Sequence, residues 1–239
     1  MIVVHSKKLI FLKTRKTAGS SFEIALSKFC DDEDIITSVG DADDETRKTM
    51  GLRGLQNDNM SIADMFQFRN LRMLKNLSRG QWPKKYYQHI SAKLAKQRLG
   101  DQIWNDYTKV AIVRNPYDYA ISSYFWAMKN TPKKPPFETW CLKKPKMFRF
   151  NHKHYFIGDE IVVDHFIRFE HFQEDTLELE RLLGLEGLHS TFSDIKAKGN
   201  HRPKAATIDD LFKGADKLKA LIRRENAFEI ERFGYQPPD

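Results

Sequence analysis

Residues 9–29 read LIFLKTRKTAGSSFEIALSKF, and this stretch decides the fold. It opens with an apolar run from Leu9 to Leu12, which predicts a short buried strand. Its last part has apolar side chains at the i, i+3, i+4 and i+7 spacing of an amphipathic helix: Phe22, Ala25, Leu26 and Phe29. Thr, Lys, Gly and Ser dominate residues 13–21, which therefore predict a turn between strand and helix.

A second strand-turn-helix unit begins at Val110. The buried run Val110–Val113 is followed by Arg114, Asn115 and Pro116, and Asn with Pro directly after it is a strong start signal for a helix. The pattern further predicts a strand over 161–169, a β-prone segment over 86–90, and helices over 61–77, 92–99, 172–183 and 211–222.

Strands that alternate with helices predict an α/β fold. We expect one domain over residues 1–239, with a central parallel sheet flanked by helices. Residues 31–80 are expected to form a variable acidic and helical insertion, and the acidic part, up to about residue 54, a mobile excursion.

The composition excludes several classes of protein. Of the 239 residues, 41% are hydrophobic, which is enough for a packed core and argues against general disorder. Two cysteines are too few for a disulfide framework or a metal cage. Apolar runs are far below the roughly 20 residues of a membrane span, and Met1–Val4 is too short for a signal-peptide core. We therefore expect a cytoplasmic protein.

The charge is unevenly distributed along the chain. The net charge is +8, but residues 31–45 contain eight acids and no base, so the remaining residues carry +16 (8 + 8). Residues 129–153 hold eight Lys or Arg against one acid, and residues 196–204 hold four against none. Such runs suit an anionic ligand, although a solvated face is the more common explanation of any single run.

The first turn, residues 13–21, has the ingredients of a phosphate cradle. Unpaired amides at the start of a helix attract an anion, and Lys16 adds a positive charge. A Walker A loop is excluded because no glycine stands at the required position ahead of the Lys16–Ser21 segment. A capped structural turn with a surface lysine remains an open alternative.

The second turn, from Arg114 onward, offers a similar choice. Arg114 follows an apolar strand, and Ser122 lies under two helical turns beyond Pro116, so both could reach one anion at the carboxyl edge of the sheet. The alternative is an arginine that forms an ion pair and a serine that bonds to its own helix.

Together the two turns resemble those of the sulfotransferases that use 3′-phosphoadenosine 5′-phosphosulfate (PAPS). Lys16-Thr17-Ala18-Gly19-Ser20-Ser21 is similar to the family's 5′-phosphosulfate loop, and Arg114-Asn115-Pro116 with Ser122 and Tyr124 to its 3′-phosphate motif. The resemblance is closest to the carbohydrate branch that includes the heparan sulfate 2-O-sulfotransferases. It continues through residues 88–92, 163–170 and 233–235, and covers most of the chain outside residues 31–80.

The resemblance implies a P-loop-like sulfotransferase fold, PAPS as the donor substrate and no metal. It implies that His89 is the catalytic base, a role that suits the ordinary histidine pKa near 6.5, and that Lys16 stabilises the leaving phosphate. The basic loop over residues 200–204, called here the late basic loop, would close over the nucleotide. The donor-binding residues implied are Arg15, Lys16, Thr17, Ala18, Gly19, Ser20, Ser21, Arg114, Ser122, Arg202 and Lys204.

Three positions depart from the family pattern. Arg15 replaces the usual proline, Tyr119 replaces a second arginine of the 3′-phosphate motif, and Gln88 stands where glycine usually precedes the histidine. The role of the missing arginine could pass to the late basic loop. The family's Arg-Phe-Glu pattern also suggests that Arg168 and Glu170 pair with each other at the sheet edge.

Two other functions compete with this interpretation. The basic balance would suit a nucleic-acid or polyanion binding module, but no recognition-helix, aromatic or zinc-finger signature is present, so we expect no nucleic-acid partner. A P-loop kinase would require the missing glycine.

The acceptor is expected to be a hydroxyl compound, most simply a carbohydrate, and residues 129–153 are a candidate surface for an acidic glycan. His152 and His154 at i, i+2 spacing, without a carboxylate, do not suggest a metal site.

Overall fold

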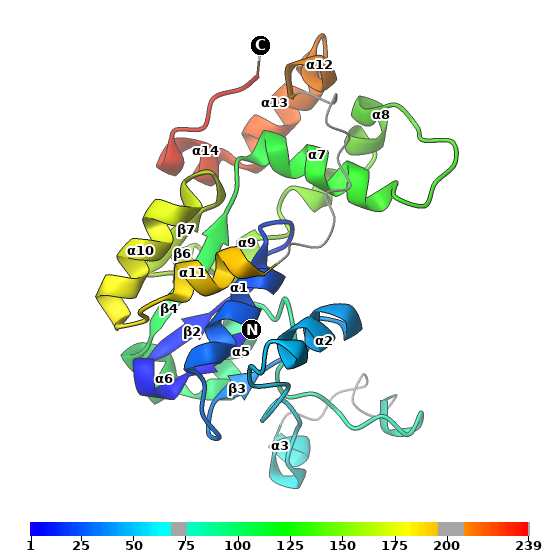
Figure 1. The fold of residues 1–239 in the computed structure, drawn as a ribbon. Coiled ribbons are helices and arrows are strands. Elements are labelled where there is room, and N and C mark those ends of the chain that lie inside the picture. The colour runs from blue at the N-terminus through cyan, green and yellow to red at the C-terminus, as the bar shows by residue number, and fades with distance from the viewer. Residues whose placement is uncertain (68–75, 196–207, 239) are drawn as a thin grey trace.

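A computed structural model describes residues 1–67, 76–195 and 208–238 of the chain. At its centre is a five-stranded sheet with strand order β3-β1-β2-β4-β7 (Figure 1). A separate two-stranded ribbon pairs β5 with β6. The strands are β1 (Ile2–Val4), β2 (Leu9–Phe11), β3 (Ile35–Ile36), β4 (Thr108–Val113), β5 (Phe156–Ile157), β6 (Glu160–Ile161) and β7 (His165–Arg168).

The sheet is mixed, which corrects the expectation of a parallel sheet. Strands β2, β4 and β7 are parallel to one another, whereas β1 is antiparallel to both of its neighbours. The reason is the connection from β1 to β2, a single tight turn over His5–Lys7 that ends at Lys8 in the left-handed conformation. So short a link permits only antiparallel pairing, since parallel strands need a long crossover.

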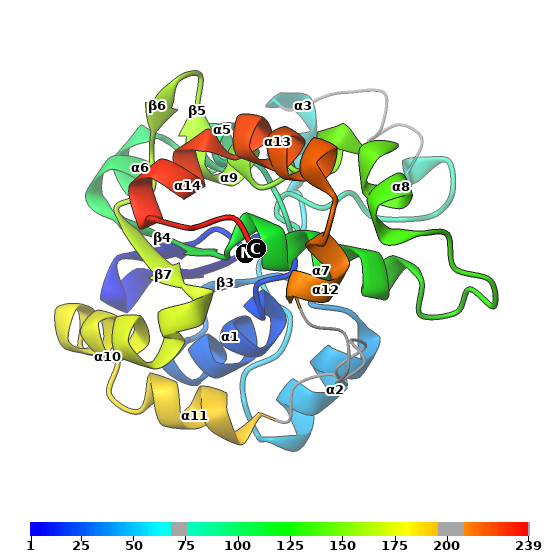
Figure 2. The same cartoon turned by 90° about the horizontal axis from the view of Figure 1, so that it is seen from above.

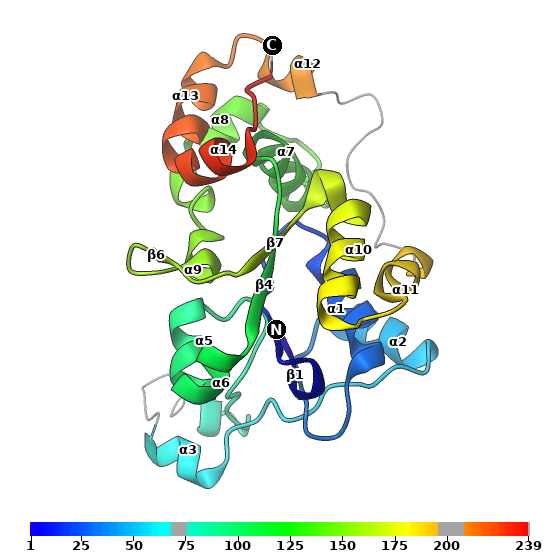
Figure 3. The same cartoon turned by 90° about the vertical axis from the view of Figure 1, so that its left-hand side faces the viewer.

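The helices cover both faces of the sheet and its carboxyl edge. Helices α1, α10 and α11 lie on one face and α5 and α6 on the other, while α7, α8 and α12–α14 gather beyond the carboxyl ends of the parallel strands (Figures 2 and 3). The helices are α1 (Gly19–Leu26), α2 (Asp41–Thr49), α3 (Ile62–Gln67), α5 (Ala92–Leu99), α6 (Asp101–Asp106), α7 (Pro116–Ala127), α8 (Phe137–Leu142), α9 (His152–Tyr155), α10 (Phe172–Leu183), α11 (Leu188–Asp194), α12 (Ile208–Phe212), α13 (Asp216–Glu225) and α14 (Ala227–Phe233).

Alternation along the strands builds a core on each face of the sheet. Ile10 and Leu12 of the β2 segment pack on the α5 side, whereas Leu9 and Phe11 pack on the α1 side. Successive side chains of a strand point to opposite faces, and here both faces are buried. This arrangement fixes the end of β2, and therefore the first turn, at the carboxyl edge.

Several helices begin and end where the sequence predicts. Helix α5 and helix α10 have the expected bounds. Helix α7 starts at Pro116, and the Asn115 side-chain oxygen accepts a hydrogen bond of 2.9 Å from the Tyr117 amide, as expected for an N-cap.

Other segments differ from the expectation. Residues 86–90 form turns rather than a strand, because the Tyr86 amide binds the Asp58 carbonyl, the Ile90 amide binds the Tyr87 carbonyl and His89 has a positive φ angle. The strand expected over 161–169 divides into β6 and β7, and the last helix divides into α12 and α13. The helix expected over 61–77 is present as α3, and its continuation over 68–75 lies outside the described residues.

The acidic segment contributes regular structure instead of a mobile excursion. It supplies β3 at the sheet edge and then α2, whose Arg47 is fully buried with an ion pair of 3.0 Å to Asp44. Asp34 is also buried and accepts a hydrogen bond of 2.6 Å from the His5 amide. These carboxylates satisfy donors within the fold, so their abundance does not mark a solvated loop.

No helix within residues 1–67, 76–195 and 208–238 combines the length and the apolar character that a bilayer crossing requires.

Candidate functional site

The first turn, residues 13–21, connects the end of β2 to α1 and includes the first residues of that helix. Lys16 and Ala18 have φ angles of 60° and 58°, so the turn contains two left-handed residues that are not glycine. Such a backbone directs successive amides toward one concave side, where an anion can bind. In the part of the chain that the structure describes, no acceptor binds the amides of residues 16–21. The turn therefore presents unpaired donors at the N-terminus of an eight-residue helix.

Hydroxyl groups anchor this turn to the neighbouring strand. The Thr14 hydroxyl donates to the Ile112 carbonyl of β4 at 2.6 Å and lies 2.8 Å from the Thr17 hydroxyl. Thr17 is fully buried, and its side chain holds the turn in place. Ser20 and Ser21 are half-buried at the start of α1.

Gly19 and the Lys13 side chain approach each other closely. A Cβ atom at residue 19 would lie 3.1 Å from Lys13 Cγ and 3.4 Å from the Thr14 carbonyl oxygen. The Lys13 side chain runs beneath the turn and reaches Glu23 of α1, where its Nζ lies 2.9 Å from Oε2. Burial alone would raise the pKa of Glu23, but the Lys13 and Met1 ammonium groups hold that pKa below its ordinary value.

The Lys13–Glu23 pair should be essential for the stability of the turn. Both side chains are almost fully buried, so Glu23→Gln leaves the Lys13 charge uncompensated. We expect this variant to lose about 3–5 kcal/mol of unfolding free energy in chemical denaturation. Glu45→Gln, on the exposed side of α2, is the matched control and should change stability by less than about 0.5 kcal/mol. Equal stability of the two variants would contradict this assignment.

Arg114 physically joins the second turn to the first. Its Nη1 donates to the Lys16 carbonyl at 2.6 Å, while Nε and Nη2 bind Asp118 Oδ2 at 2.8 and 2.5 Å. The guanidinium carbon also lies 4.1 Å from the Phe169 ring centroid. Ser122 follows Asp118 by one helical turn on the same side of α7 and is half-buried. Sequence reasoning identified Arg114 but not its carboxylate partner.

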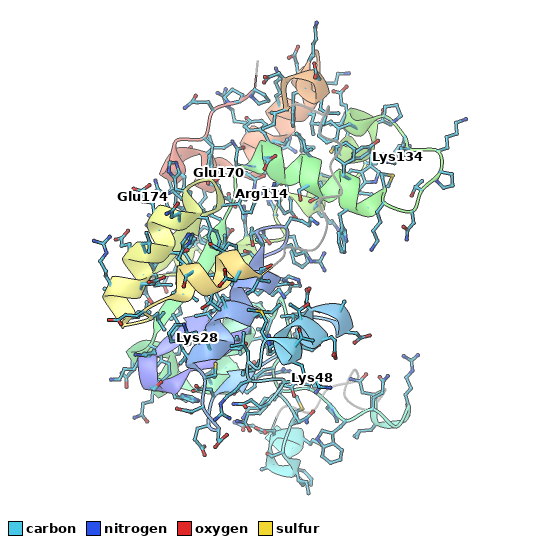
Figure 4. All side chains as sticks on the ribbon, in the orientation of Figure 1. Lys28, Lys48, Arg114, Lys134, Glu170 and Glu174 are labelled. Atoms are coloured by element: carbon cyan, nitrogen blue, oxygen red, sulfur yellow. The ribbon has the colours of Figure 1, made fainter. Side chains whose placement is uncertain are left out.

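Glu170 is a second acid at this turn. Figure 4 shows Arg114 and Glu170 close together between α7 and α10, and Glu170 accepts hydrogen bonds from the Asn115 amide at 2.7 Å and the Tyr235 hydroxyl at 2.9 Å. The expected pairing of Arg168 with Glu170 is wrong. Arg168 instead binds Asp175 with Nη2–Oδ1 at 2.6 Å, because α10 turns back and presents Asp175 to the end of β7.

The ammonium group of Lys16 rests on an aromatic ring. Its Nζ lies 4.2 Å from the Trp126 ring centroid, and the Lys129 Nζ lies 4.3 Å from that centroid. Burial, together with the positive charges of Arg114 and Lys129, lowers the pKa of Lys16 to about 8. Lys16 therefore stays largely charged at neutral pH but is poised to interact with an added anion.

His89 lies against the base of the first turn. Its Nδ1 is 3.0 Å from the Lys13 carbonyl oxygen, and because a carbonyl only accepts, Nδ1 carries the proton and Nε2 has the free electron pair. His89 has a φ angle of 58°, so its backbone is strained. Burial and the positive charges of Lys13 and Arg15 lower its pKa to about 4, despite the opposing bond to the carbonyl. The imidazole is thus neutral near pH 7.

Arg15 is tied to the segment of Phe150 and Asn151 by both its backbone and its side chain. Its amide donates to Asn151 Oδ1 at 2.9 Å, and its guanidinium carbon lies 3.7 Å from the Phe150 ring centroid. Tyr119, which stands where the family has arginine, is buried in the core beneath α7 and donates to the Met147 carbonyl at 3.3 Å. Arg202 and Lys204 of the late basic loop lie outside the described residues.

Part of the basic stretch over residues 129–153 is paired or buried within the fold. Arg149 forms an ion pair of 2.5 Å with Glu225, and His152 lies 3.1 Å from Glu229. His154 is buried, with Nδ1 bonded to the Ile90 carbonyl. Across residues 1–67, 76–195 and 208–238, no cluster of three or more His, Cys, Asp or Glu side chains has the arrangement of a metal site.

The turns and His89 combine three chemical capabilities at the carboxyl edge of the sheet. The unpaired amides and Lys16 can hold one anionic group. Arg114 uses three of its five N–H donors within the protein, and the other two can bind a second anionic group. His89 Nε2 can accept a proton. Lys13, Glu23, Asp118 and Trp126 complete the site and were not found from the sequence. No family model matches the chain, and neither a curated protein nor a solved structure matches it significantly.

Proposed function

We propose that this chain is a sulfotransferase, which moves the sulfuryl group of PAPS to a hydroxyl of a carbohydrate acceptor. The observation that carries the proposal is the bond of 2.6 Å from Arg114 to the Lys16 carbonyl. It puts two anion-binding turns side by side, which suits a nucleotide that carries phosphate at both its 5′ and 3′ positions. The resemblance of both turns to the PAPS-dependent family points to the same ligand.

The donor would lie across the two turns. The amides of residues 16–21 and the Ser20 and Ser21 hydroxyls receive the 5′-phosphosulfate, and the remaining N–H groups of Arg114, with Ser122, receive the 3′-phosphate. The late basic loop with Arg202 and Lys204 is proposed to close over the nucleotide. Asp118 holds the Arg114 fork in place but also offsets part of its charge, so the affinity depends on both turns.

The transfer step assigns one role to each side chain. His89 Nε2 accepts the proton of the acceptor hydroxyl, and the hydroxyl oxygen then forms a bond to sulfur. The bond between sulfur and the 5′-phosphate oxygen breaks, and the Lys16 ammonium stabilises the negative charge that develops on that oxygen. The products are a sulfate ester and adenosine 3′,5′-bisphosphate. The step requires no metal, because Lys16 supplies the positive charge.

A thermal-shift experiment distinguishes this proposal from the kinase alternative. At about 100 times its Kd, adenosine 3′,5′-bisphosphate should add about 2.7 kcal/mol of stability, which raises Tm by roughly 5–10 °C for a chain of 239 residues. ATP with magnesium should give a much smaller shift. A shift with ATP and magnesium alone would overturn the proposal in favour of a kinase.

The polyanion-binding alternative is favoured only by the charge of +16 outside the acidic segment. It predicts binding to DNA or RNA that weakens steeply with salt. The structure uses part of this charge internally, since Arg47, Arg149 and Arg168 all form ion pairs with acids. We therefore retain the sulfotransferase as the proposed function.

A further inference from the structure

Two cations share one aromatic ring beside the proposed base. The Arg15 guanidinium carbon lies 3.7 Å and the Lys153 Nζ 4.2 Å from the Phe150 ring centroid. Phe150 in turn meets His89 edge-on, with 6.2 Å between ring centroids. Neither cation forms an ion pair with an acid among the residues that the structure describes. The positive charges of Arg15 and Lys153 are therefore concentrated next to His89 without compensation.

This aromatic and cationic surface is built on anchored backbone. Asn151 is buried, and its side chain binds the Arg15 backbone in both directions, at 2.9 Å to the amide and 3.3 Å to the carbonyl. On the other side, Asn226 Nδ2 donates to the Phe148 carbonyl at 3.0 Å. The segment that carries Phe150 is thus tied both to the first turn and to the helices beyond the sheet.

His154, which lies beside His89 and Phe150, adds no positive charge to that of Arg15 and Lys153. His154 is buried, and its ring centroid lies 6.2 Å from that of His89 and 6.1 Å from that of Phe150. Burial and the neighbouring positive charge of Lys153 hold the pKa of His154 well below its ordinary value. Lys153 also has a lowered pKa because of burial and of Arg15, which shows that an anion here would relieve repulsion.

We infer that Arg15 and Lys153 bind an anionic group of the acceptor and so position its hydroxyl at His89. This inference rests on the proposed function and makes the acceptor an acidic saccharide. A carboxylate or sulfate can take charge-assisted hydrogen bonds from both cations. Because Phe150 contacts Arg15, Lys153 and His89, the anionic group belongs to the sugar that carries the reacting hydroxyl or to one linked directly to it.

The inference assigns the acidic glycan to Arg15 and Lys153 and not to the whole basic stretch over residues 129–153. Of the bases over 129–153, Arg149 is already paired with Glu225, and Lys143, Lys144 and Lys146 are exposed. Lys153 is exposed too, but its ammonium group lies over the Phe150 ring beside His89. Arg15 was expected to bind the donor, and its guanidinium group lies over the Phe150 ring, which meets the proposed base edge-on. Its replacement of proline then changes acceptor specificity and leaves the phosphosulfate loop in place.

Calorimetric titration with matched oligosaccharides tests this inference. The probes are an oligosaccharide of uronic acids, the same compound with its carboxylates reduced to alcohols, and the reduced compound carrying sulfate esters. The affinity of wild-type protein for at least one of the two anionic probes should exceed its affinity for the reduced probe by about tenfold or more. Arg15→Ala and Lys153→Ala should each lose about tenfold in that affinity, and Lys153→Arg should retain most of it.

Lys146→Ala is the control, because it removes an exposed lysine from the same basic stretch and should stay within about twofold of wild type. Binding of neither anionic probe, equal binding of the reduced probe, or an equal loss in Lys146→Ala would overturn the inference. Tighter binding of a DNA oligonucleotide, lowered equally by all three alanine variants, would also overturn it and indicate a general polyanion surface.

A parallel titration with adenosine 3′,5′-bisphosphate separates this inference from the proposed function. Arg15→Ala and Lys153→Ala should bind the bisphosphate within about threefold of wild type, because the inference assigns both side chains, which lie over the Phe150 ring, to the acceptor. Loss of bisphosphate affinity in Arg15→Ala, with oligosaccharide affinity unchanged, would assign Arg15 to the donor and contradict the inference. Failure of wild-type protein to bind bisphosphate, with oligosaccharide binding as expected, would refute only the donor proposal.

Discussion

Lys16→Ala is expected to reduce kcat by about 10²- to 10³-fold while changing the Kd of adenosine 3′,5′-bisphosphate far less. The desulfated product keeps its contacts with the amides of residues 16–21, so binding loses one charge among several donors. The transition state differs because negative charge develops on the leaving oxygen at the position that Lys16 serves. Single-turnover kinetics with labelled PAPS and calorimetry with the bisphosphate measure the two quantities separately.

Lys129→Ala is the matched control for this variant. Lys129 lies over the same Trp126 ring as Lys16, at almost the same distance, but it does not belong to the first turn. Its removal should change kcat by less than about threefold, since it acts only by lowering the pKa of Lys16. Modest and equal losses of turnover and of bisphosphate binding in Lys16→Ala would refute a transition-state role.

His89→Ala is expected to lower kcat by about 10²- to 10⁴-fold and to leave bisphosphate binding nearly unchanged. The base acts on the acceptor hydroxyl and makes no proposed contact with the nucleotide. His171→Ala, at an exposed position before α10, controls for the general loss of an imidazole and should retain turnover. Turnover in His89→Ala similar to that of wild type would assign proton transfer to another group.

The pH dependence of kcat/KM provides a second readout of both residues. His89 must be neutral to act and has a pKa of about 4, so activity should fall only as the pH drops toward 4. Lys16 must be charged and has a pKa of about 8, so activity should fall again above pH 8. An acidic limb near 6.5, the ordinary histidine value, would contradict the buried position of His89.

The bound state should show a shifted profile. In kcat, the limbs report the enzyme with ligands bound. The anionic donor partly offsets the charges of Lys13, Arg15 and Arg114, so both pKa values should rise when PAPS is present.

The titration of His89 also makes the unfolding free energy depend on pH. Its pKa is lowered from 6.5 by folding, so the unfolded chain binds more protons and stability declines as the pH falls from 6.5 toward 4.

The sequence predicts those elements whose signals are local. Helices α5 and α10 have a regular apolar face, and the Asn115-Pro116 pair marks the start of α7, so their bounds follow from a few adjacent residues. Strands β1 and β3 contain three and two residues, too few for a periodic pattern. Because these two short strands extend the sheet on one side, its mixed topology could not be read from the sequence.

The residues of the candidate site also differ in whether a local sequence pattern marks them. The two turns were found because each follows an apolar strand and opens a helix. Their partners come from distant segments: Asn151 binds a residue 136 positions away, and Arg114 binds one 98 positions away. No local pattern distinguishes Asn151 or Phe150 from other loop residues. Asp118 was overlooked because an acid beside a predicted anion site contradicts the simplest electrostatic expectation.

The central claim is that the two turns together form a site for a nucleotide phosphorylated at both ends of its ribose. It is tested most directly by measuring the Kd of adenosine 3′,5′-bisphosphate and of adenosine 5′-monophosphate on the same wild-type protein. We expect the bisphosphate to bind about 10- to 100-fold more tightly, because Arg114 adds charge-assisted hydrogen bonds to the 3′-phosphate. Equal affinity for the two nucleotides, or no binding of either, would contradict it.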